Sequence, residues 1–311
     1  MIALVTQLCE TENQQWLSLL NDLICDDEVK LLGSMTVADR QSCDIAIVAN
    51  PKIDDLTQLP NLIWVQSLWA GVESLIKPMQ ELDLPLVRLI DPMLSQAMAE
   101  AALAWTLYLH RDMHRYAQFQ AQNTWHQINY VEPKNRHVSI LGLGALGQEA
   151  AKVLSRQGFR VSGWSYSNKQ IDNVTCYHGE QGLQNMLQDT HILICLLPLT
   201  RETKHLLGGD LFTQLPSGAQ LINFARAGIV NRSDLFSALE TGKLAHAVLD
   251  VFEEEPLPAD SVYWNNENIT VLPHISAQTN SHSASEIVAN NVLNYRKTGV
   301  IPGGVNINKG Y

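Results

Sequence analysis

A short apolar strand that runs into a glycine-rich turn and then a helix is the feature that most constrains this chain. Strand-like residues 137–141 are followed by GLGALG at 142–147 and by the helical segment 148–157. In such a GxGxxG turn the first glycine permits a tight bend, the second lets the backbone approach a pyrophosphate, and the third lets helix and strand pack closely. The motif predicts a dinucleotide site at the helix N-terminus. The expected contacts are Gly142, Gly144, Ala145, Leu146 and Gly147.

Apolar strands alternate with helical segments along the whole chain. They are expected at 2–6, 43–50, 62–68, 84–90, 137–141, 159–165, 190–197, 219–225, 246–252 and 269–275. Strands this continuously apolar are usually parallel and buried on both faces, and 311 residues exceed one average core. We therefore expect an α/β fold of two domains. A Rossmann-type doubly wound sheet, residues 98–276, is inserted into a smaller flavodoxin-like substrate domain formed by 1–97 and 277–311.

Composition excludes several classes of protein. The formal net charge of -11 argues against nucleic acid as a partner, because phosphate binding needs a basic surface. No apolar run approaches the roughly 20 residues that cross a bilayer, and the N-terminus lacks the basic region of a signal peptide. We expect a soluble, cytoplasmic protein without a membrane partner.

Five cysteines without CxxC spacing predict reduced thiols. His110 and His114 are four apart but lack the HExxH pattern, so no metal is expected.

The strand at 159–165 ends in a segment that bears on cofactor choice. An NAD site usually has Asp or Glu there to bind the ribose 2'-hydroxyl. Here the sequence is WSYSNK, with no carboxylate. Ser165 and Lys169 could instead donate hydrogen bonds to a 2'-phosphate, which favours NADPH over NADH. The alternative is an exposed polar turn with no preference.

Three segments, NFARAGIV, LDVFEEEPLP and LPHISAQT, each end a predicted strand, where open α/β sheets bind ligands. With the glycine loop and LLPLTRET, they resemble the D-isomer-specific 2-hydroxyacid dehydrogenase family over nearly the whole chain. WAGVE, LDVFEEEPLP and the terminal GY resemble most closely the bacterial glyoxylate/hydroxypyruvate reductases. The resemblance implies NADPH-dependent reduction of small 2-oxo acids. A lactate- or phosphoglycerate-type dehydrogenase is the alternative enzyme, and a nucleotide-sensing scaffold without catalysis is the alternative of another class.

The resemblance also implies a catalytic set. Arg226 matches the arginine that binds the substrate carboxylate and carbonyl, His274 the proton donor, and Glu255 its carboxylate partner. The chemistry agrees, because reducing a 2-oxo acid needs a cation, an acid and a hydride source. Without the resemblance, Arg226 would be read as a surface ion-pair residue and His274 as a core histidine. The family pattern of Glu before Pro selects Glu255 over its two neighbouring glutamates. The family usually has Arg-Gly where this chain has Arg226-Ala227.

The remaining site residues also follow from the resemblance. Backbone N–H groups of Ala70 and Gly71 would bind the substrate carboxylate together with Arg226, and a local anion site of this kind is compatible with a globally acidic protein. Trp69 would line the pocket or simply pack. The further cofactor contacts would be Pro198, Ala225 and Asp250, with Asp250 at the nicotinamide carboxamide.

A long helix is expected from Ser95 to about Gln118, followed by a polar loop that contains Trp125. In related enzymes this region forms the interface of a homodimer, so the resemblance implies a homodimer here. A last helix, about 277–297, is expected to pack back on the N-terminal domain.

Overall fold

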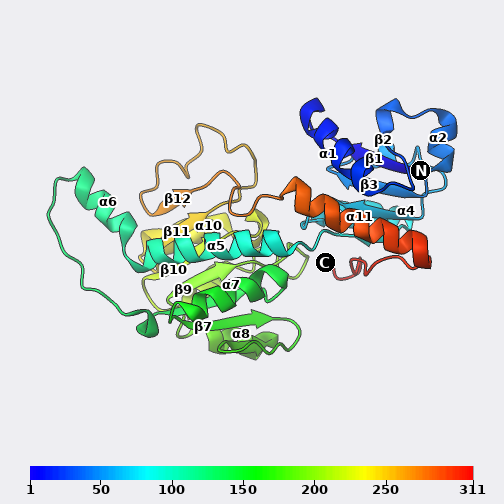
Figure 1. The fold of residues 1–311 in the computed structure, drawn as a ribbon. Helices are drawn as coiled ribbons and strands as arrows, with labels where there is room; N and C mark the ends of the chain where they lie inside the picture. Colours follow the sequence, from blue (N-terminus) through cyan, green and yellow to red (C-terminus); the bar gives the residue numbers. More distant parts are fainter. Residues whose placement is uncertain (311) are drawn as a thin grey trace. The chain divides into compact units, whose positions relative to one another are not determined.

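The computed structural model describes residues 1–310, which form two compact units (Figure 1). Unit 1 comprises Met1–Met93 and the segment that begins at Thr279, and unit 2, Leu94–Gln278, is inserted between these two parts. Tyr311, the end of the terminal Gly-Tyr, lies outside the described residues. Within residues 1–310, no helix combines the length and the apolar character needed to cross a membrane.

Unit 1 contains one parallel sheet of five strands in the order β2-β1-β3-β4-β5. This is the flavodoxin-like order, as predicted. The strands are β1 (Ile2–Thr6), β2 (Val29–Leu31), β3 (Ile45–Ala49), β4 (Trp64–Ser67) and β5 (Leu86–Val87). The helices are α1 (Glu10–Leu23), α2 (Val37–Ser42), α3 (Ile53–Leu56), α4 (Glu73–Leu82) and α11 (Ser281–Thr298), with the 3-10 turn η1 (Leu32–Ser34).

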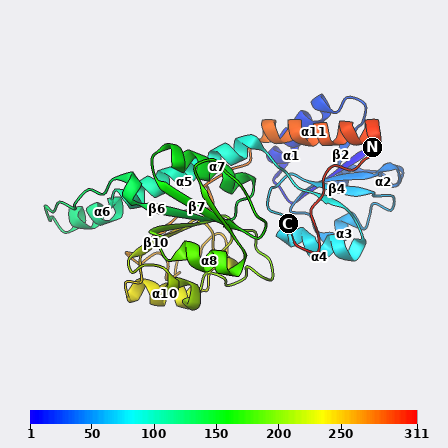
Figure 2. The ribbon, with the colours of Figure 1, turned by 90° about the horizontal axis from the view of Figure 1, so that it is seen from below.

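Both faces of this sheet are buried, which explains why its strands are continuously apolar. Successive side chains of a strand point to opposite faces. Ile2 and Leu4 therefore join the core under α1 and α11, whereas Ala3 and Val5 join the core under α3 and α4. Figure 2 shows α1 and α11 on one side of the sheet and α3 and α4 on the other. The last helix packs on the N-terminal sheet, as expected, although it begins at Ser281.

Unit 2 contains a parallel sheet of seven strands in the order β12-β11-β10-β9-β6-β7-β8. The chain order reverses between β6 and β9, which is the Rossmann arrangement that was predicted. The strands are β6 (His137–Leu141), β7 (Arg160–Ser165), β8 (Thr175–His178), β9 (Ile192–Cys195), β10 (Ala219–Asn223), β11 (Leu244–Leu249) and β12 (Ile269–Val271). The helices are α5 (Pro92–His110), α6 (Met113–Ala121), α7 (Ala145–Arg156), α8 (Gly179–Leu187), α9 (Gly209–Gln214) and α10 (Arg232–Glu240), with 3-10 turns η2 (Pro133–Asn135) and η3 (Ala227–Ile229).

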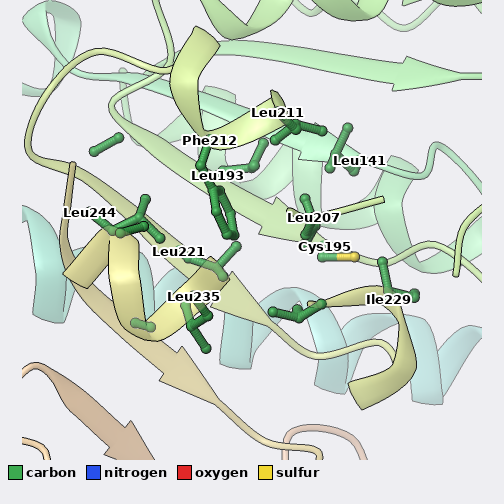
Figure 3. Close-up of a cluster of buried hydrophobic side chains, with 14 of the residues drawn as sticks. Leu141, Leu193, Cys195, Leu207, Leu211, Phe212, Leu221, Ile229, Leu235 and Leu244 are labelled. Atoms are coloured by element: carbon green, nitrogen blue, oxygen red, sulfur yellow. The ribbon is translucent and has the colours of Figure 1, made fainter. Parts of the chain in front are cut away.

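The same alternation builds two cores in unit 2. Ile192 and Ile194 pack with residues of α5 and α7, whereas Leu193 and Cys195 pack with residues of α8, α9 and α10. In Figure 3, Leu193 lies close to Phe212 of α9 in the second of these cores. A central strand covered on both faces leaves only its ends open to a ligand, and the predicted site residues follow the carboxyl ends, where doubly wound sheets bind ligands.

Besides strands that end earlier than predicted, such as β5 and β12, the elements differ from the predicted ones in two respects. The edge strands β2 and β8 were not predicted, because they are short and half-exposed and so lack a long apolar run. The helix expected over 95–118 is instead two helices, α5 and α6. The break lies at Asp112, whose φ of 54° is left-handed, and its N–H donates to the carbonyl of Leu109 rather than continuing the helical pattern.

Candidate active site

Two glycines of the loop after β6 are required by the fold itself. Gly142 has a φ of +103°, and a Cβ there would lie 2.7 Å from the Leu196 carbonyl oxygen. A Cβ on Gly147 would lie 1.8 Å from the carbonyl oxygen of Gly142, so any side chain would push α7 off β6. These positions therefore have the close backbone approaches that the sequence motif predicts.

Gly144 is different, because nothing in the protein requires a glycine there. Its φ is -75°, and a Cβ would meet no protein atom within 4 Å. Gly144 is the N-cap residue of α7, and it supplies no side-chain cap, so the first N–H groups of this twelve-residue helix are available to another acceptor. The loop thus offers both the room and the hydrogen-bond donors that a pyrophosphate needs, and its residues fit a dinucleotide cofactor.

Four further predicted residues follow the carboxyl ends of adjacent strands. Pro198 follows β9, Arg226 follows β10, Glu255 follows β11 and His274 follows β12. These strands are consecutive neighbours in the sheet, next to β6 and its glycine loop. The topology therefore places these residues along one edge of unit 2, where doubly wound sheets bind their ligands.

His274 and Glu255 form a direct hydrogen bond. His274 Nδ1 lies 2.7 Å from one carboxylate oxygen of Glu255, and the other oxygen accepts from the Phe252 N–H at 2.9 Å. Because a carboxylate only accepts, Nδ1 carries the proton and Nε2 is left for another partner. The His274 side chain is 52% exposed, so its imidazole can contact a bound molecule. This arrangement orients an imidazole for proton transfer.

The backbone of His274 is held by a buried carboxylate. His274 has a φ of +53°, a left-handed conformation that is uncommon for residues other than glycine. Immediately after it, the N–H groups of Ile275 and Ser276 donate to the two oxygens of Asp250, at 2.8 and 2.9 Å. Asp250 is only 2% exposed. It therefore fixes the turn that presents His274, whatever it contacts in a cofactor.

The turn that carries Arg226 is fixed by an asparagine. Asn223, the last residue of β10, is 1% exposed. Its side chain accepts from the Ala225 N–H and donates to the Arg226 carbonyl, both at 3.2 Å. Arg226 is half-buried, and one of its guanidinium nitrogens donates to the Ala225 carbonyl oxygen at 2.7 Å. The local backbone thus restrains the orientation of the Arg226 side chain at the end of β10.

The end of β7 carries hydroxyl and amine groups instead of a carboxylate. Ser165 Oγ donates to the Ser167 carbonyl at 2.7 Å, which closes a tight turn, and Lys169 is half-buried nearby in the sequence. Tyr166 lies edge-on to Trp164, with ring centroids 4.9 Å apart. The turn therefore presents a cation and polar groups beside the loop end of β6.

In unit 1, the loop after β4 is held at Trp69. The Trp69 N–H donates to Ser67 Oγ at 3.0 Å, and its carbonyl accepts from the Leu89 N–H at 3.1 Å. Within the described part of the chain, the N–H groups of Ala70 and Gly71 have no protein acceptor. Two successive free N–H groups in a fixed loop can bind a small anion such as a carboxylate.

Comparison with known proteins shows which family has this architecture. The family model described as "D-isomer specific 2-hydroxyacid dehydrogenase, NAD binding domain" matches residues 103–276, more than half of the chain. The chain belongs to this family. Glyoxylate/hydroxypyruvate reductase A of Photorhabdus laumondii is 37% identical to the dehydrogenase over 88% of the chain and 89% of that protein. The enzyme of the same name from Serratia proteamaculans is 35% identical over 94% of each.

Solved structures extend the same likeness to the fold. The family member from Xanthobacter autotrophicus Py2, in complex with NADPH and MES, has a TM-score of 0.93 and 34% identity, covering 99% of each chain. The NADPH-dependent glyoxylate/hydroxypyruvate reductase of Sinorhizobium meliloti, in complex with NADP and sulfate, has a TM-score of 0.91 and 29% identity, covering 100% of the dehydrogenase and 99% of that chain. The dehydrogenase is thus an NAD(P)-dependent oxidoreductase resembling these reductases.

Sequence reasoning missed two features of the dehydrogenase's site. Asn223 was not singled out, although a polar amide that ends the apolar run of β10 is a recognisable signal for a side chain bonded to the following turn. Asp250 was assigned to the cofactor alone. Its bonds to Ile275 and Ser276 join residues 25 and 26 positions apart, which no local pattern reveals.

The two histidines with metal-like spacing both point into the protein. His110 packs edge-on against Phe159, and His114 lies against His246 of β11 with ring centroids 4.3 Å apart. The described residues include no cluster of three or more His, Cys, Asp or Glu able to hold a metal ion. His110 and His114 are both buried within unit 2, at 4% and 5% exposure.

Proposed function

We propose that this dehydrogenase reduces small 2-oxo acids, such as glyoxylate and hydroxypyruvate, to 2-hydroxy acids with NADPH. The hydrogen bond of 2.7 Å between His274 and Glu255 carries the proposal, because it orients an acid at the sheet edge that also bears Arg226 and the glycine loop. The names of the relatives from Photorhabdus and Serratia support the substrate class.

Each residue of the set has one role in the proposed reaction. The bound cofactor supplies a hydride to the carbonyl carbon. His274 Nε2 donates its proton to the carbonyl oxygen as the C=O bond opens, and the product is the 2-hydroxy acid. The imidazole gives up its Nε2 proton and keeps Nδ1–H on Glu255, so Glu255 holds the orientation of the ring throughout the transfer.

Two kinds of group would bind the substrate carboxylate. Arg226 offers a planar pair of donors that matches a carboxylate. The free N–H groups of Ala70 and Gly71 offer donors without a net charge. Such local donors are needed because the protein as a whole, with a net charge of -11, repels anions.

For the cofactor, we propose NADPH rather than NADH. The turn after β7 has no carboxylate to bind a 2'-hydroxyl, and Lys169 could donate to a 2'-phosphate. Ser165 could also donate to it by exchanging its bond to the Ser167 carbonyl for one to the phosphate. The structural relatives from Xanthobacter and Sinorhizobium were solved with NADPH and NADP. Pro198, Ala225 and Asp250 would complete the cofactor contacts. We expect kcat/KM to be higher with NADPH, and a ratio that favours NADH would refute this assignment.

The deciding experiment follows NADPH oxidation at 340 nm with glyoxylate, hydroxypyruvate, pyruvate and phenylpyruvate in turn. The expected result is turnover that is fastest with glyoxylate or hydroxypyruvate. Preference for pyruvate would indicate a lactate-type enzyme. No turnover with any of the four acids, combined with measurable NADPH binding, would favour a nucleotide-sensing scaffold and overturn the proposal.

We also propose that the dehydrogenase is a homodimer joined through the region of α6 and the loop after it. Figure 1 shows α6 extending away from the sheet of unit 2. Exposed aromatic side chains lie in this region: Trp125 is 95% exposed and Tyr130 is 63% exposed.

Light scattering should give about twice the chain mass of 34.7 kDa. Trp125→Ser should weaken the dimer at least ~30-fold if Trp125 is a central contact, whereas Val37→Ser, at a site 74% exposed in unit 1, should not. A wild-type monomer at micromolar concentration would contradict the proposal.

A further inference from the structure

Trp69, which directly precedes the free Ala70 and Gly71 N–H groups, is held in unit 1 by its side chain as well as by its backbone. The Trp69 indole N–H donates to Asn50 Oδ1 at 3.2 Å. Its ring lies edge-on to Trp16 of α1, with centroids 6.3 Å apart and an interplanar angle of 79°. Trp16 is 5% exposed and belongs to the core between the sheet and α11. Trp69 thus connects the loop to that core.

Asn50 occupies an unusual backbone position for this contact. It directly follows β3, the strand next to β4, and its φ of 51° is left-handed. Asparagine tolerates this conformation better than most residues. Because Asn50 is exposed, no packing requirement explains an amide side chain there. Its one hydrogen bond to another side chain within residues 1–310 is the bond to the Trp69 indole.

We propose that Asn50 and Trp16 are positioning residues for substrate binding, acting through Trp69. The inference rests on the proposed function, in which the Ala70 and Gly71 N–H groups bind the substrate carboxylate. The Trp69 backbone is already fixed at both ends, by Ser67 and Leu89. The indole bond to Asn50 and the edge contact with Trp16 hold the same residue from its side-chain end, so that Trp69 as a whole is restrained from shifting. The next two N–H groups then keep their positions when an anion binds.

Two substitutions remove the Trp69–Asn50 hydrogen bond while keeping the other properties of the two residues. Asn50→Gly removes the acceptor and leaves the left-handed backbone unstrained, and Trp69→Phe removes the donor and keeps an aromatic ring. Each should raise KM for the 2-oxo acid about 3- to 10-fold, the range of one net hydrogen bond. The double variant should be no worse than either single variant, because both remove the same bond. KM for NADPH should stay unchanged, since the cofactor loop lies in unit 2.

Binding of oxalate, a small carboxylate that accepts no hydride, gives a readout independent of turnover. Calorimetry on the NADPH-loaded protein should show the same 3- to 10-fold weakening in Asn50→Gly and Trp69→Phe. If the wild type binds oxalate and the variants bind it more weakly, but no acid is reduced, the proposed function fails and the positioning role stands. The positioning role fails if oxalate does not bind the wild type, or if the variants bind it as tightly as the wild type. It also fails if the effects of the two substitutions simply add.

Asn50→Ala serves as the matched backbone control. Alanine also lacks the acceptor, but it strains a left-handed position. Loss of the bond predicts that the glycine and alanine variants share the change in KM, while only the alanine variant loses thermal stability. A change of KM in Asn50→Ala without one in Asn50→Gly would show that backbone strain, not the indole bond, matters, and would overturn the inference.

Discussion

Replacing His274 by glutamine is expected to lower kcat for 2-oxo acid reduction by roughly 10²- to 10⁴-fold, the usual contribution of a positioned general acid. Glutamine is polar, of similar reach and able to hydrogen-bond Glu255, but it cannot release a proton to the carbonyl oxygen. Stopped-flow or steady-state oxidation of NADPH measures the loss. The Kd for NADPH, measured by fluorescence, should be unchanged, because the glycine loop and the turn after β7 are untouched.

Glu255→Gln is the matched control for this prediction. The amide can still accept from the Phe252 N–H and from His274 Nδ1–H, but an uncharged acceptor holds the imidazole less strongly than a carboxylate does. We therefore expect a smaller loss of kcat than in His274→Gln. A His274→Gln variant that keeps more than a tenth of wild-type kcat would remove His274 from the role of proton donor. Weakened NADPH binding would instead indicate that the turn held by Asp250 had collapsed.

The sequence predicted those parts of the fold that depend on local requirements. The glycine loop, the α/β fold class and the family were predicted from runs of residues that are adjacent in the chain, and the structure and comparisons confirm them. The edge strand β8 escaped prediction because one side of it faces solvent, so it needs no apolar run. The helix break at Asp112 escaped because no glycine or proline marks it in the sequence and only one backbone angle reverses.

The catalytic set remains a prediction, although its local geometry is visible. The spacing of Glu255 and His274 along the chain does not reveal their contact, and only the family pattern suggested it before the structure placed them 2.7 Å apart. The support that Asp250 gives to Ile275 and Ser276 depends on how β11 and β12 pair. Such contacts between neighbouring strands arise from the sheet register, which single-sequence reasoning does not supply.

A pair of buried histidines in unit 2, His114 and His246, makes the stability of the fold depend on pH. His246 of β11 and His114 of α6 lie with ring centroids 4.3 Å apart, and both Nδ1 atoms are buried without a partner in the described residues. His246 Nε2 bonds Thr270 Oγ1 at 2.9 Å. Burial, and then the neighbouring His114, lowers the pKa of His246 to about 3. Burial also lowers the pKa of His114, against the smaller opposing effect of Asp112.

These shifts predict that the dehydrogenase loses stability between about pH 6.5 and pH 3. In that range the unfolded chain protonates its histidines, with a pKa near ~6.5, while folded His246 stays neutral. The unfolded state then binds more protons, so the free energy of unfolding falls as pH falls and is independent of His246 above about pH 7. From pH 7 to pH 5 the loss due to His246 alone is about 2 kcal/mol, and His114 adds to it in the same direction.

His246→Gln tests this prediction, because glutamine can bond Thr270 but does not titrate. The variant is expected to be less stable than the wild type at pH 7.5, through lost packing against His114. Between pH 7.5 and pH 5 its Tm should nevertheless fall less than that of the wild type, and the difference between the two falls should be about 4 to 8 °C for a unit of this size.

His126→Gln, at an exposed histidine of the same unit, should leave the wild-type fall in Tm intact. Scanning calorimetry at the two pH values measures all three proteins. Equal falls in Tm for wild type and His246→Gln would show that other groups, such as the buried His110 and His137, govern acid stability.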